Sequence, residues 1–293
     1  MKVVLVSTFA KGAYGHVVKK IFHEMGHQVF IFDPRNMMAL GKKPKDIGDD
    51  FVFLCDAVEP DVVFAIKGRG LHPDFIKDVP ALKVVWWLDN ITRYSDFNKY
   101  INVYDRYWVI EEGQGHPWMA IGIDPTLHKP VTPDDKKFDS DIIFAGTAHR
   151  ERSGRLMEIL RGLPCNIALW GNSWRNDTPY LRGGAIYWYD LMKAYTGSKI
   201  ILNNHYVKGI TPNMRCIEAP ASGTAMLSDT GNGLEQCLKK DKEYISYDSL
   251  KEARYLTLKY LEETEEREKI AKAGYRRIYK EHLLVDKLTE MIS

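Results

Sequence analysis

Short apolar runs rich in β-branched residues recur along the chain, and they constrain its fold more than any other feature of the sequence. In the first half they cover Val3–Val6, Val29–Phe32, Val62–Ile66, Val84–Leu88 and Tyr107–Ile110. Helix-compatible segments such as Val17–Met25 separate several of them. Continuous apolar runs are typical of strands buried on both faces, and their alternation with helices indicates parallel βαβ units.

The same pattern returns in the second half, at Ile142–Ala145, Ile167–Trp170, Ile200–Leu202, Ala225–Ser228 and Tyr244–Ser246. Between the halves, residues 124–137 contain three prolines and a cluster of charges without periodicity, which is typical of a linker. The length of 293 residues favours two domains. We therefore predict an α/β chain of two doubly wound, Rossmann-like domains, residues 1–130 and 131–280. Ligands are expected in the cleft where the carboxyl ends of the two sheets face each other.

The carboxy-terminal stretch from Leu250 to Ile292 is helical in composition. Gly274 is predicted to stop a helix within it, and a last helix is predicted over Leu283–Ile292.

Composition excludes several classes of protein. A hydrophobic share of 45% and a charged share of 27% are those of a globular protein rather than a disordered or fibrous one. The net charge of +2 provides no global field to hold a nucleic acid or an anionic membrane. The four cysteines form no CxxC pair, and no apolar stretch approaches the roughly 20 residues that span a bilayer. We expect a cytoplasmic protein whose amino terminus is a buried strand rather than a signal peptide.

The loop after the first predicted strand contains Gly12 and Gly15 and leads into a helix near His16. Glycines allow close backbone approach, and a helix start offers N–H groups to an anion. Asp33 ends the second strand, where nicotinamide enzymes carry a ribose-binding acid, but the full GxGxxG pattern is missing. An imidazole facing the cleft can take a proton from a hydroxyl near neutral pH, so His16 is a candidate base. A glycine turn with a structural histidine is the alternative.

A second candidate is Asp89, which follows a predicted strand that ends in Trp86 and Trp87. Its carboxylate is a candidate base, or a group that orients His16 or an acceptor hydroxyl. Trp87 beside that carboxylate suits stacking on a sugar ring. The alternative is a core tryptophan pair with Asp89 capping the next helix.

Gly146 and Thr147 lie at a predicted helix entrance after the first strand of the second domain, with Arg150 and Arg152 close behind. Such a turn predicts a phosphate site, and an N-capped helix with exposed arginines is the alternative. The DxD sequence Asp139–Asp141 enters a strand and is interpreted as solvated, so no metal site is predicted.

The segment from residue 203 to 229 is the most informative. Thr211 and Pro212 predict a helix start, which Pro220 interrupts and Gly223 ends. Glu218 falls on an apolar stretch of this helix, where a carboxylate needs a partner such as a ribose diol. Arg215 could neutralise phosphate charge. A structural helix with a salt-bridged Glu218 is the alternative.

With these residues in view, the chain resembles glycosyltransferases of the GT-B fold, and most closely the CgeB-type (spore-maturation-protein-like) group among the glycosyl transferases group 1. The resemblance covers most of the chain. It lies in Trp86–Asp89, Tyr104–Asp105, Gly122–Pro125, Phe144–Thr147 with Arg152, Trp170–Trp174, Asn213–Gly223, Lys269–Arg277 and Glu281–His282.

The resemblance implies a nucleotide-sugar donor held mainly by the second domain, an acceptor held mainly by the first, and a last helix, 281–293, that packs back on the first. Glu218 matches the glutamate that hydrogen-bonds the donor ribose. The donor-binding residues that the resemblance and the loops together indicate are Gly146, Thr147, Arg152, Gly171, Trp174, Asn213, Arg215 and Glu218.

Two departures bear on the mechanism. Ile210 stands where many retaining relatives carry another glutamate, eight residues before the ribose glutamate, which leaves the donor sugar open. Gly15-His16 is similar to inverting enzymes in which such a histidine is the base, and this favours inversion slightly.

The sequence thus predicts a metal-independent glycosyltransferase without a cofactor, which moves a hexosyl or pentosyl group to a hydroxyl of a polysaccharide, protein, small molecule or modified DNA base. DNA is not favoured at this net charge, although Lys11, Lys19, Lys20, Lys67 and Arg69 could form a local basic patch. The alternatives are a catalytically inactive GT-B-like binding protein and, further off, a nicotinamide-dependent oxidoreductase.

Overall fold

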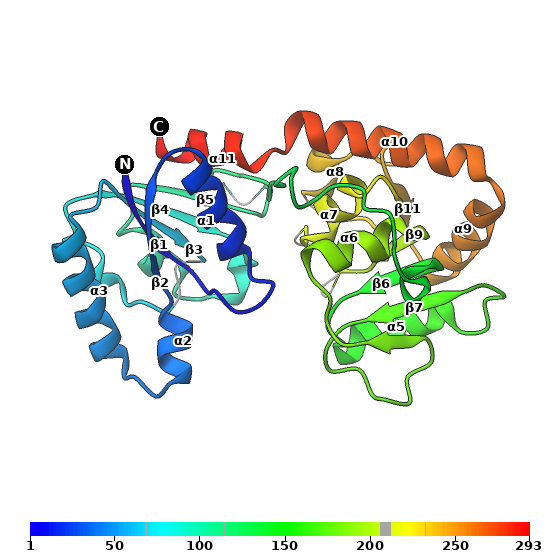
Figure 1. Ribbon diagram of the computed structural model, residues 1–293, viewed down its shortest axis with the longest axis horizontal. Coiled ribbons are helices and arrows are strands. Elements are labelled where there is room, and N and C mark those ends of the chain that lie inside the picture. The colour runs from blue at the N-terminus through cyan, green and yellow to red at the C-terminus, as the bar shows by residue number, and fades with distance from the viewer. Residues whose placement is uncertain (68–69, 114, 206–211, 232) are drawn as a thin grey trace. The chain divides into compact units, whose positions relative to one another are not determined.

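The chain divides into two compact units, each with its own parallel sheet (Figure 1). The computed structural model describes residues 1–67, 70–113, 115–205, 212–231 and 233–293. Unit 1 comprises Met1–Asp124 and Leu284–Ser293, and unit 2 comprises Pro125–Leu283. The boundary falls after Asp124 rather than at the predicted residue 130, and the last helix, α11 (Leu284–Ile292), belongs to unit 1.

Unit 1 is built on a sheet with the strand order β2-β1-β3-β4-β5, in which neighbouring strands are parallel. Its strands are β1 (Lys2–Val6), β2 (Gln28–Phe32), β3 (Val62–Ile66), β4 (Leu82–Trp87) and β5 (Arg106–Val109). The predicted apolar runs of the first half are therefore strands, and their observed bounds differ from the predicted ones by two residues or less. The doubly wound α/β prediction is confirmed for this unit.

Helices connect these strands and cover the sheet. They are α1 (Tyr14–Glu24), α2 (Pro34–Ala39), α3 (Pro44–Val58) and α4 (Phe97–Ile101), with short 3-10 turns at Pro73–Phe75 and Ile91–Arg93. α1 buries Val17, Val18, Ile21 and Phe22, which are spaced three to four residues apart as an amphipathic helix requires. Proline occupies the first position of both α2 and α3, where its missing N–H has no partner to lose.

Unit 2 contains a second sheet, with the order β11-β10-β9-β6-β7-β8 and parallel neighbours. Its strands are β6 (Ser140–Ala145), β7 (Ile167–Trp170), β8 (Leu181–Gly183), β9 (Ser198–Asn203), β10 (Ala225–Asp229) and β11 (Ile245–Tyr247). The sequence did not predict β8, because this three-residue edge strand is only half-buried and has no apolar run. The other five strands were predicted.

The helices of unit 2 are α5 (Arg150–Leu160), α6 (Trp188–Thr196), α7 (Arg215–Ala221), α8 (Leu234–Cys237), α9 (Leu250–Glu262) and α10 (Thr264–Glu281), with a 3-10 turn at Lys136–Phe138. The prediction that Gly274 stops a helix is wrong, since this residue lies inside α10. A Cβ at Gly274 would lie 2.4 Å from the carbonyl oxygen of Glu243, so the glycine allows close packing of α10. None of the helices in the described residues is long and apolar enough to cross a membrane.

Candidate functional site

The candidate site of unit 2 lies at the carboxyl ends of its central strands. Gly146 directly follows β6, Gly171 follows β7, His205 comes two residues after β9, and Asp229 ends β10. The carboxyl ends of parallel strands share one edge of a sheet, and ligands of doubly wound domains bind at that edge.

The predicted residues Gly146, Gly171 and Trp174 lie together and join the loops after β6 and β7. The N–H of Gly146 donates to the carbonyl of Trp170 at 2.8 Å, and the indole N–H of Trp174 donates to the carbonyl of Gly146 at 3.0 Å. A Cβ on Gly171 would lie 2.0 Å from that same carbonyl oxygen, and Gly171 has a φ of +149°. Only glycine fits this position without displacing the turn.

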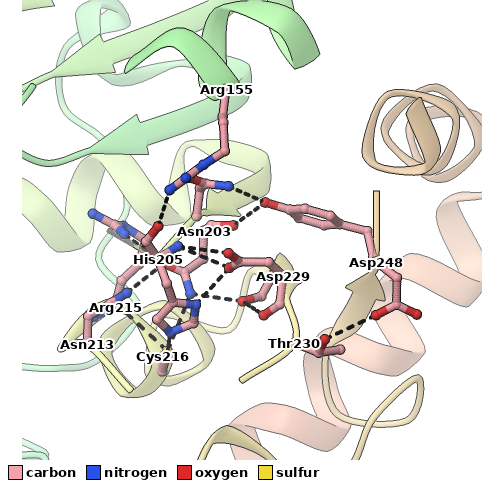
Figure 2. A network of polar contacts seen from close by, with 12 residues as sticks. Arg155, Asn203, His205, Asn213, Arg215, Cys216, Asp229, Thr230 and Asp248 are labelled. Carbon is pink, nitrogen blue, oxygen red and sulfur yellow. Dashed lines mark hydrogen bonds and ion pairs between the residues drawn. The ribbon is translucent and has the colours of Figure 1, made fainter. Parts of the chain in front are cut away.

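Arg215, the first residue of α7, is buried beside this turn (Figure 2). Its Nη1 donates to Oδ1 of Asn203 at 2.7 Å, and its Nη2 donates to the carbonyl of Ala145. The guanidinium lies 4.3 Å from the ring centroid of Phe144, which is a cation–π distance. Asn213 donates to Asn203 and accepts from the backbone N–H of Arg215, both at 3.0 Å. A positive charge is therefore held in a fixed position at the ends of β6 and β9.

Thr147 and Arg152, the other predicted phosphate contacts, bond to each other. Nη2 of Arg152 donates to the carbonyl of Thr147, and its guanidinium lies 5.3 Å from the ring centroid of Phe144. α5 begins at Arg150, so Gly146 and Thr147 form the turn that precedes this helix. Two arginines thus flank one aromatic ring at the turn after β6.

Glu218 lies in α7 with its side chain only 16% exposed, and an imidazole from outside this helix lies near its carboxylate. Nε2 of His128, from the segment after Asp124, lies 3.8 Å from Oε1 of Glu218. Burial raises the pKa of the Glu218 carboxyl, while His128 and Arg215 lower it, and the net direction is upward. The sequence did not indicate His128, because it lies in a segment interpreted only as a linker.

The bounds of α7 correct part of the prediction for this segment. The helix begins at Arg215, later than the predicted start at Thr211 and Pro212; Thr211 lies outside the described residues, as does Ile210. Pro220 does not interrupt the helix but lies in its last turn, where it removes a single backbone donor. Gly223 follows with a φ of +77°, as expected of a residue that ends a helix.

A network of buried polar residues extends the site toward β10 (Figure 2). Nδ1 of His205 lies 2.7 Å from Oδ1 of Asp229, and the backbone N–H of His205 reaches both carboxylate oxygens at 3.1 Å. Its Nε2 lies 3.5 Å from Sγ of Cys216, and Arg155 donates to its carbonyl at 2.6 Å. Burial by itself lowers the pKa of His205, but Cys216 and Asp229 raise it to about 10. Imidazolium is therefore the favoured form of His205 in the folded chain at neutral pH.

In unit 1, the loop after β1 and the first turn of α1 contain three of the predicted residues. Gly12 has a φ of +79°, and a Cβ on Gly15 would lie 2.6 Å from the carbonyl oxygen of Thr8, so both positions need glycine. His16 lies in the first turn of α1, and its Nε2 is 2.7 Å from the carbonyl oxygen of Phe9. Because a carbonyl only accepts, Nε2 carries the hydrogen and Nδ1 is the atom through which a neutral His16 would act as a base.

Asp89 lies just after β4, where Nζ of Lys67 is 3.1 Å from Oδ1 and the Tyr94 hydroxyl donates to Oδ2 at 3.4 Å. It does not cap the next turn; that cap is Asn90, which accepts from the N–H of Thr92. The expected role of Trp87 in contacting an acceptor is corrected, because its side chain is completely buried in the core of unit 1.

The structure also bears on the nicotinamide interpretation and on the basic patch. Asp33 caps α2, with Oδ1 accepting from the N–H of Asn36 at 2.9 Å and Oδ2 accepting from the N–H of Phe9 at 2.7 Å. Both oxygens therefore serve the fold rather than a ribose. Of the basic patch, Arg69 lies outside the described residues, and Lys20 is paired with Asp124 at 2.8 Å.

The DxD sequence is only partly solvated. Asp139 is exposed, but Asp141 pairs with Lys199 at 2.7 Å and accepts from the N–H of Asn166 at 2.8 Å. Within the residues that the structure describes, no group of three or more His, Cys, Asp or Glu side chains is arranged to hold a metal ion.

Sequence reasoning missed the polar residues that organise the site from the strand ends. Asn203, His205 and Asp229 follow or end buried strands, and that position was the available signal. His128 carried no comparable signal.

Comparisons of the sequence with known proteins give one match, to a family model. Residues 150–293 match the family described as glycosyl transferase-like, a range that includes α5, α7 and the β7, β9 and β10 strand ends. The search of curated proteins finds no match by sequence.

Solved structures share the whole fold. HepE from Anabaena, in complex with UDP-glucose, aligns with a TM-score of 0.72 and 12% identity over 100% of this chain and 98% of its own. Sucrose-phosphate synthase from Thermosynechococcus elongatus aligns with a TM-score of 0.75 and 10% identity over 99% and 97%. An alpha-glucosyltransferase in complex with UDP-glucose and DNA containing an abasic site aligns with a TM-score of 0.64 and 9% identity over 99% and 98%. The chain therefore has the GT-B fold of two Rossmann-like domains, and its residues 150–293 carry the sequence pattern of the glycosyl transferase-like family.

Proposed function

We propose that the protein is a glycosyltransferase that moves a sugar from a nucleotide diphosphate sugar, with UDP-sugars as the first candidates, to a hydroxyl acceptor. One observation carries the proposal. The segment that matches the glycosyl transferase-like family places Glu218 and Arg215 on one short helix at the strand ends of unit 2. A carboxylate for a ribose diol and a fixed cation for a diphosphate are the two groups that a nucleotide-sugar site needs. HepE, which shares the fold, is solved with UDP-glucose.

The proposed donor contacts follow from this arrangement. Glu218 accepts hydrogen bonds from the ribose hydroxyls, and the buried guanidinium of Arg215 faces the diphosphate with Arg152 nearby. In this proposal the turn at Gly146 and Thr147, which precedes α5, lies beside the same phosphates. Of the remaining candidates, Gly171 and Trp174 border the proposed pocket for the nucleotide base. Asn213 lies just before α7, where it hydrogen-bonds the backbone N–H of Arg215.

In the proposed reaction, the bond between the anomeric carbon and the diphosphate oxygen breaks, and a bond from that carbon to the acceptor oxygen forms. The leaving nucleoside diphosphate takes the electron pair, and the acceptor proton passes to a base. His16, through Nδ1, and Asp89 are the proposed candidates for that base. The arginines supply positive charge at the leaving group, so we propose that neither a metal nor a cofactor is required.

Titration calorimetry with UDP-glucose, and then with GDP-, ADP-, CMP- and dTDP-sugars, tests the donor site. Glu218→Gln keeps the volume but loses the charge that strengthens two hydrogen bonds, so we expect affinity to fall about 10- to 100-fold. Glu262→Gln, at an exposed position at the end of α9, is the matched control and leaves affinity unchanged. Equal affinity for wild type and Glu218→Gln would remove Glu218 from the site.

Turnover separates an active enzyme from an inactive GT-B-like binding protein. Release of nucleoside diphosphate in the presence of an acceptor library, with and without EDTA, is the measurement. Polysaccharide, protein, small-molecule and modified-DNA acceptors all belong in that library. Donor binding without release under any of these conditions would favour the binding protein, and loss of release with EDTA would contradict the metal-free proposal.

A further inference from the structure

His128 connects the segment after Asp124 to the proposed ribose carboxylate. Its side chain is only 2% exposed, and its Nε2 lies 3.8 Å from Oε1 of Glu218. That separation is an ion-pair distance rather than a direct hydrogen bond, so the interaction is electrostatic and depends on a proton on the imidazole.

The backbone at and near His128 is held by hydrogen bonds from two helices of unit 2. The hydroxyl of Tyr279, in α10, donates to the carbonyl of His128 at 2.7 Å. Three residues later, the N–H of Val131 donates to Oγ1 of Thr196, at the end of α6, at 3.1 Å. A residue whose backbone is held in this way loses little further backbone entropy when it acts on a neighbour.

The charges around Glu218 leave a role for this imidazole. Among the residues that the structure describes, the titratable and charged side chains that interact with its carboxylate are His128, Arg215 of α7 and Tyr195 of α6. Arg215 donates to Asn203 and to the carbonyl of Ala145, so its guanidinium is fixed at the strand ends by these hydrogen bonds. Tyr195 is completely buried, and burial raises the pKa of its hydroxyl, so it stays neutral.

A carboxylate must be ionised to accept hydrogen bonds from both hydroxyls of a ribose diol. Burial opposes that ionisation at Glu218, because a desolvated carboxylate is costly without a nearby positive charge. An imidazolium at His128 would supply such a charge 3.8 Å from Oε1, and together with Arg215 it lowers the pKa of Glu218.

We propose that His128 is a positioning residue for donor binding, which keeps Glu218 ionised and oriented toward the ribose of a nucleotide sugar. The inference rests on the proposed function. It assigns a binding role to the segment between the last strand of unit 1 and the first strand of unit 2, which the sequence indicated only as a linker.

The test is the pH dependence of UDP-glucose affinity, or of the best-bound nucleotide sugar, between pH 5 and 8. In wild type, affinity falls at the acid end as Glu218 becomes protonated. Without the imidazolium the pKa of Glu218 rises further, so in His128→Gln this acid limb moves up by about one pH unit, and affinity measured on that limb falls about tenfold. His23→Gln, at an exposed position in α1, is the matched control and leaves the profile unchanged.

Two further measurements keep the inference open to refutation. In a Glu218→Gln background, His128→Gln has no additional effect on affinity, because the group through which it acts is gone. If His128→Gln unfolds, His128→Asn replaces it, and the loss of the acid limb in Glu218→Gln alone tests the role of the carboxylate.

An acid limb that is unchanged in a folded His128 variant, or an additive loss in the double variant, overturns the inference while the proposed function stands. Absence of nucleotide-sugar binding by wild type overturns both. That outcome is seen in the first titration, before any variant is made, so the two failures are distinguishable.

Discussion

Replacing Asp229 by asparagine tests whether the buried pair with His205 stabilises unit 2 through charge. The two side chains are 6% and 3% exposed, and their atoms Oδ1 and Nδ1 are 2.7 Å apart. Asparagine keeps the volume and one acceptor oxygen, but it removes the negative charge and one acceptor for the backbone N–H of His205. Removing one partner of a buried pair leaves the other charge uncompensated, which is strongly destabilising.

The magnitude follows from the pKa of His205. The difference between about 10 in the folded chain and the ordinary 6.5 corresponds to about 5 kcal/mol, at about 1.36 kcal/mol per unit. Cys216 contributes part of this shift, so we expect Asp229→Asn to lose about 3 kcal/mol of unfolding free energy at pH 6. Because the folded pKa is raised, the stabilisation is complete below pH 6.5 and is lost as pH rises from 6.5 toward 10. The loss caused by the substitution should therefore shrink between pH 6 and pH 9.5.

Urea unfolding of the full chain at the two pH values, followed by far-UV circular dichroism, measures this. Asp177→Asn is the matched control, since Asp177 pairs with Arg175 at 2.8 Å but is 70% exposed. An exposed pair of this kind contributes little to stability, because solvent screens the charges. A loss in Asp229→Asn no larger than in the control, or one that is the same at pH 6 and pH 9.5, would refute the reasoning.

Two further predictions concern the candidate sites. His16→Ala and Asp89→Ala are expected to lower turnover at least about 100-fold with little change in donor affinity, and stopped assays with saturating donor show whether either is the base. A variant with wild-type turnover excludes that residue. Gly171→Ala forces a Cβ against the carbonyl of Gly146 and should lower both stability and donor affinity. Gly154→Ala, on the open face of α5, should instead raise stability by about 0.5–1 kcal/mol. Thermal unfolding and calorimetry of the two variants give the comparison.

Most of the fold could be predicted from the sequence because the parallel strands are buried on both faces. A strand such as Val62–Ile66 is completely buried and appears in the sequence as an uninterrupted apolar run, so its bounds were predicted without error. The edge strand β8 escaped because its residues are half-exposed and form no such run. Gly274 was misinterpreted for a different reason: glycine ends helices, but it also permits close packing, and sequence alone does not separate these uses.

The site could be predicted in part, and the part that failed depends on tertiary contacts. Gly146 and Arg215 were named from their positions, Gly171 and Trp174 from the family resemblance, and the structure brings the four together. The contact between His128 and Glu218 joins residues 90 positions apart in the chain, in a segment without periodicity, and no local pattern predicts it. Trp87 shows the reverse error, because an aromatic residue beside a carboxylate looks the same in a core as in a sugar site.

The polar network around Asn203 couples folding to donor binding at Arg215. Asn203 is fully buried; its Oδ1 accepts from Arg215 and Asn213, its Nδ2 donates to Ser228 at 2.9 Å, and its carbonyl accepts from Tyr247 at 3.0 Å. Buried networks of this kind are stable only when every member is satisfied, so removing Arg215 should cost folding and donor binding together.

Glu218 is placed differently. In the part of the chain that the structure describes, it takes no part in the hydrogen bonds around Asn203, and its charge is balanced across space by His128 and Arg215. A neutral glutamine in its place relieves the cost of burying a charge while removing an acceptor that a ribose needs. Glu218→Gln should therefore retain or slightly raise the unfolding temperature while affinity falls. A loss of donor affinity without a loss of thermal stability is expected of a residue that serves a ligand rather than the fold.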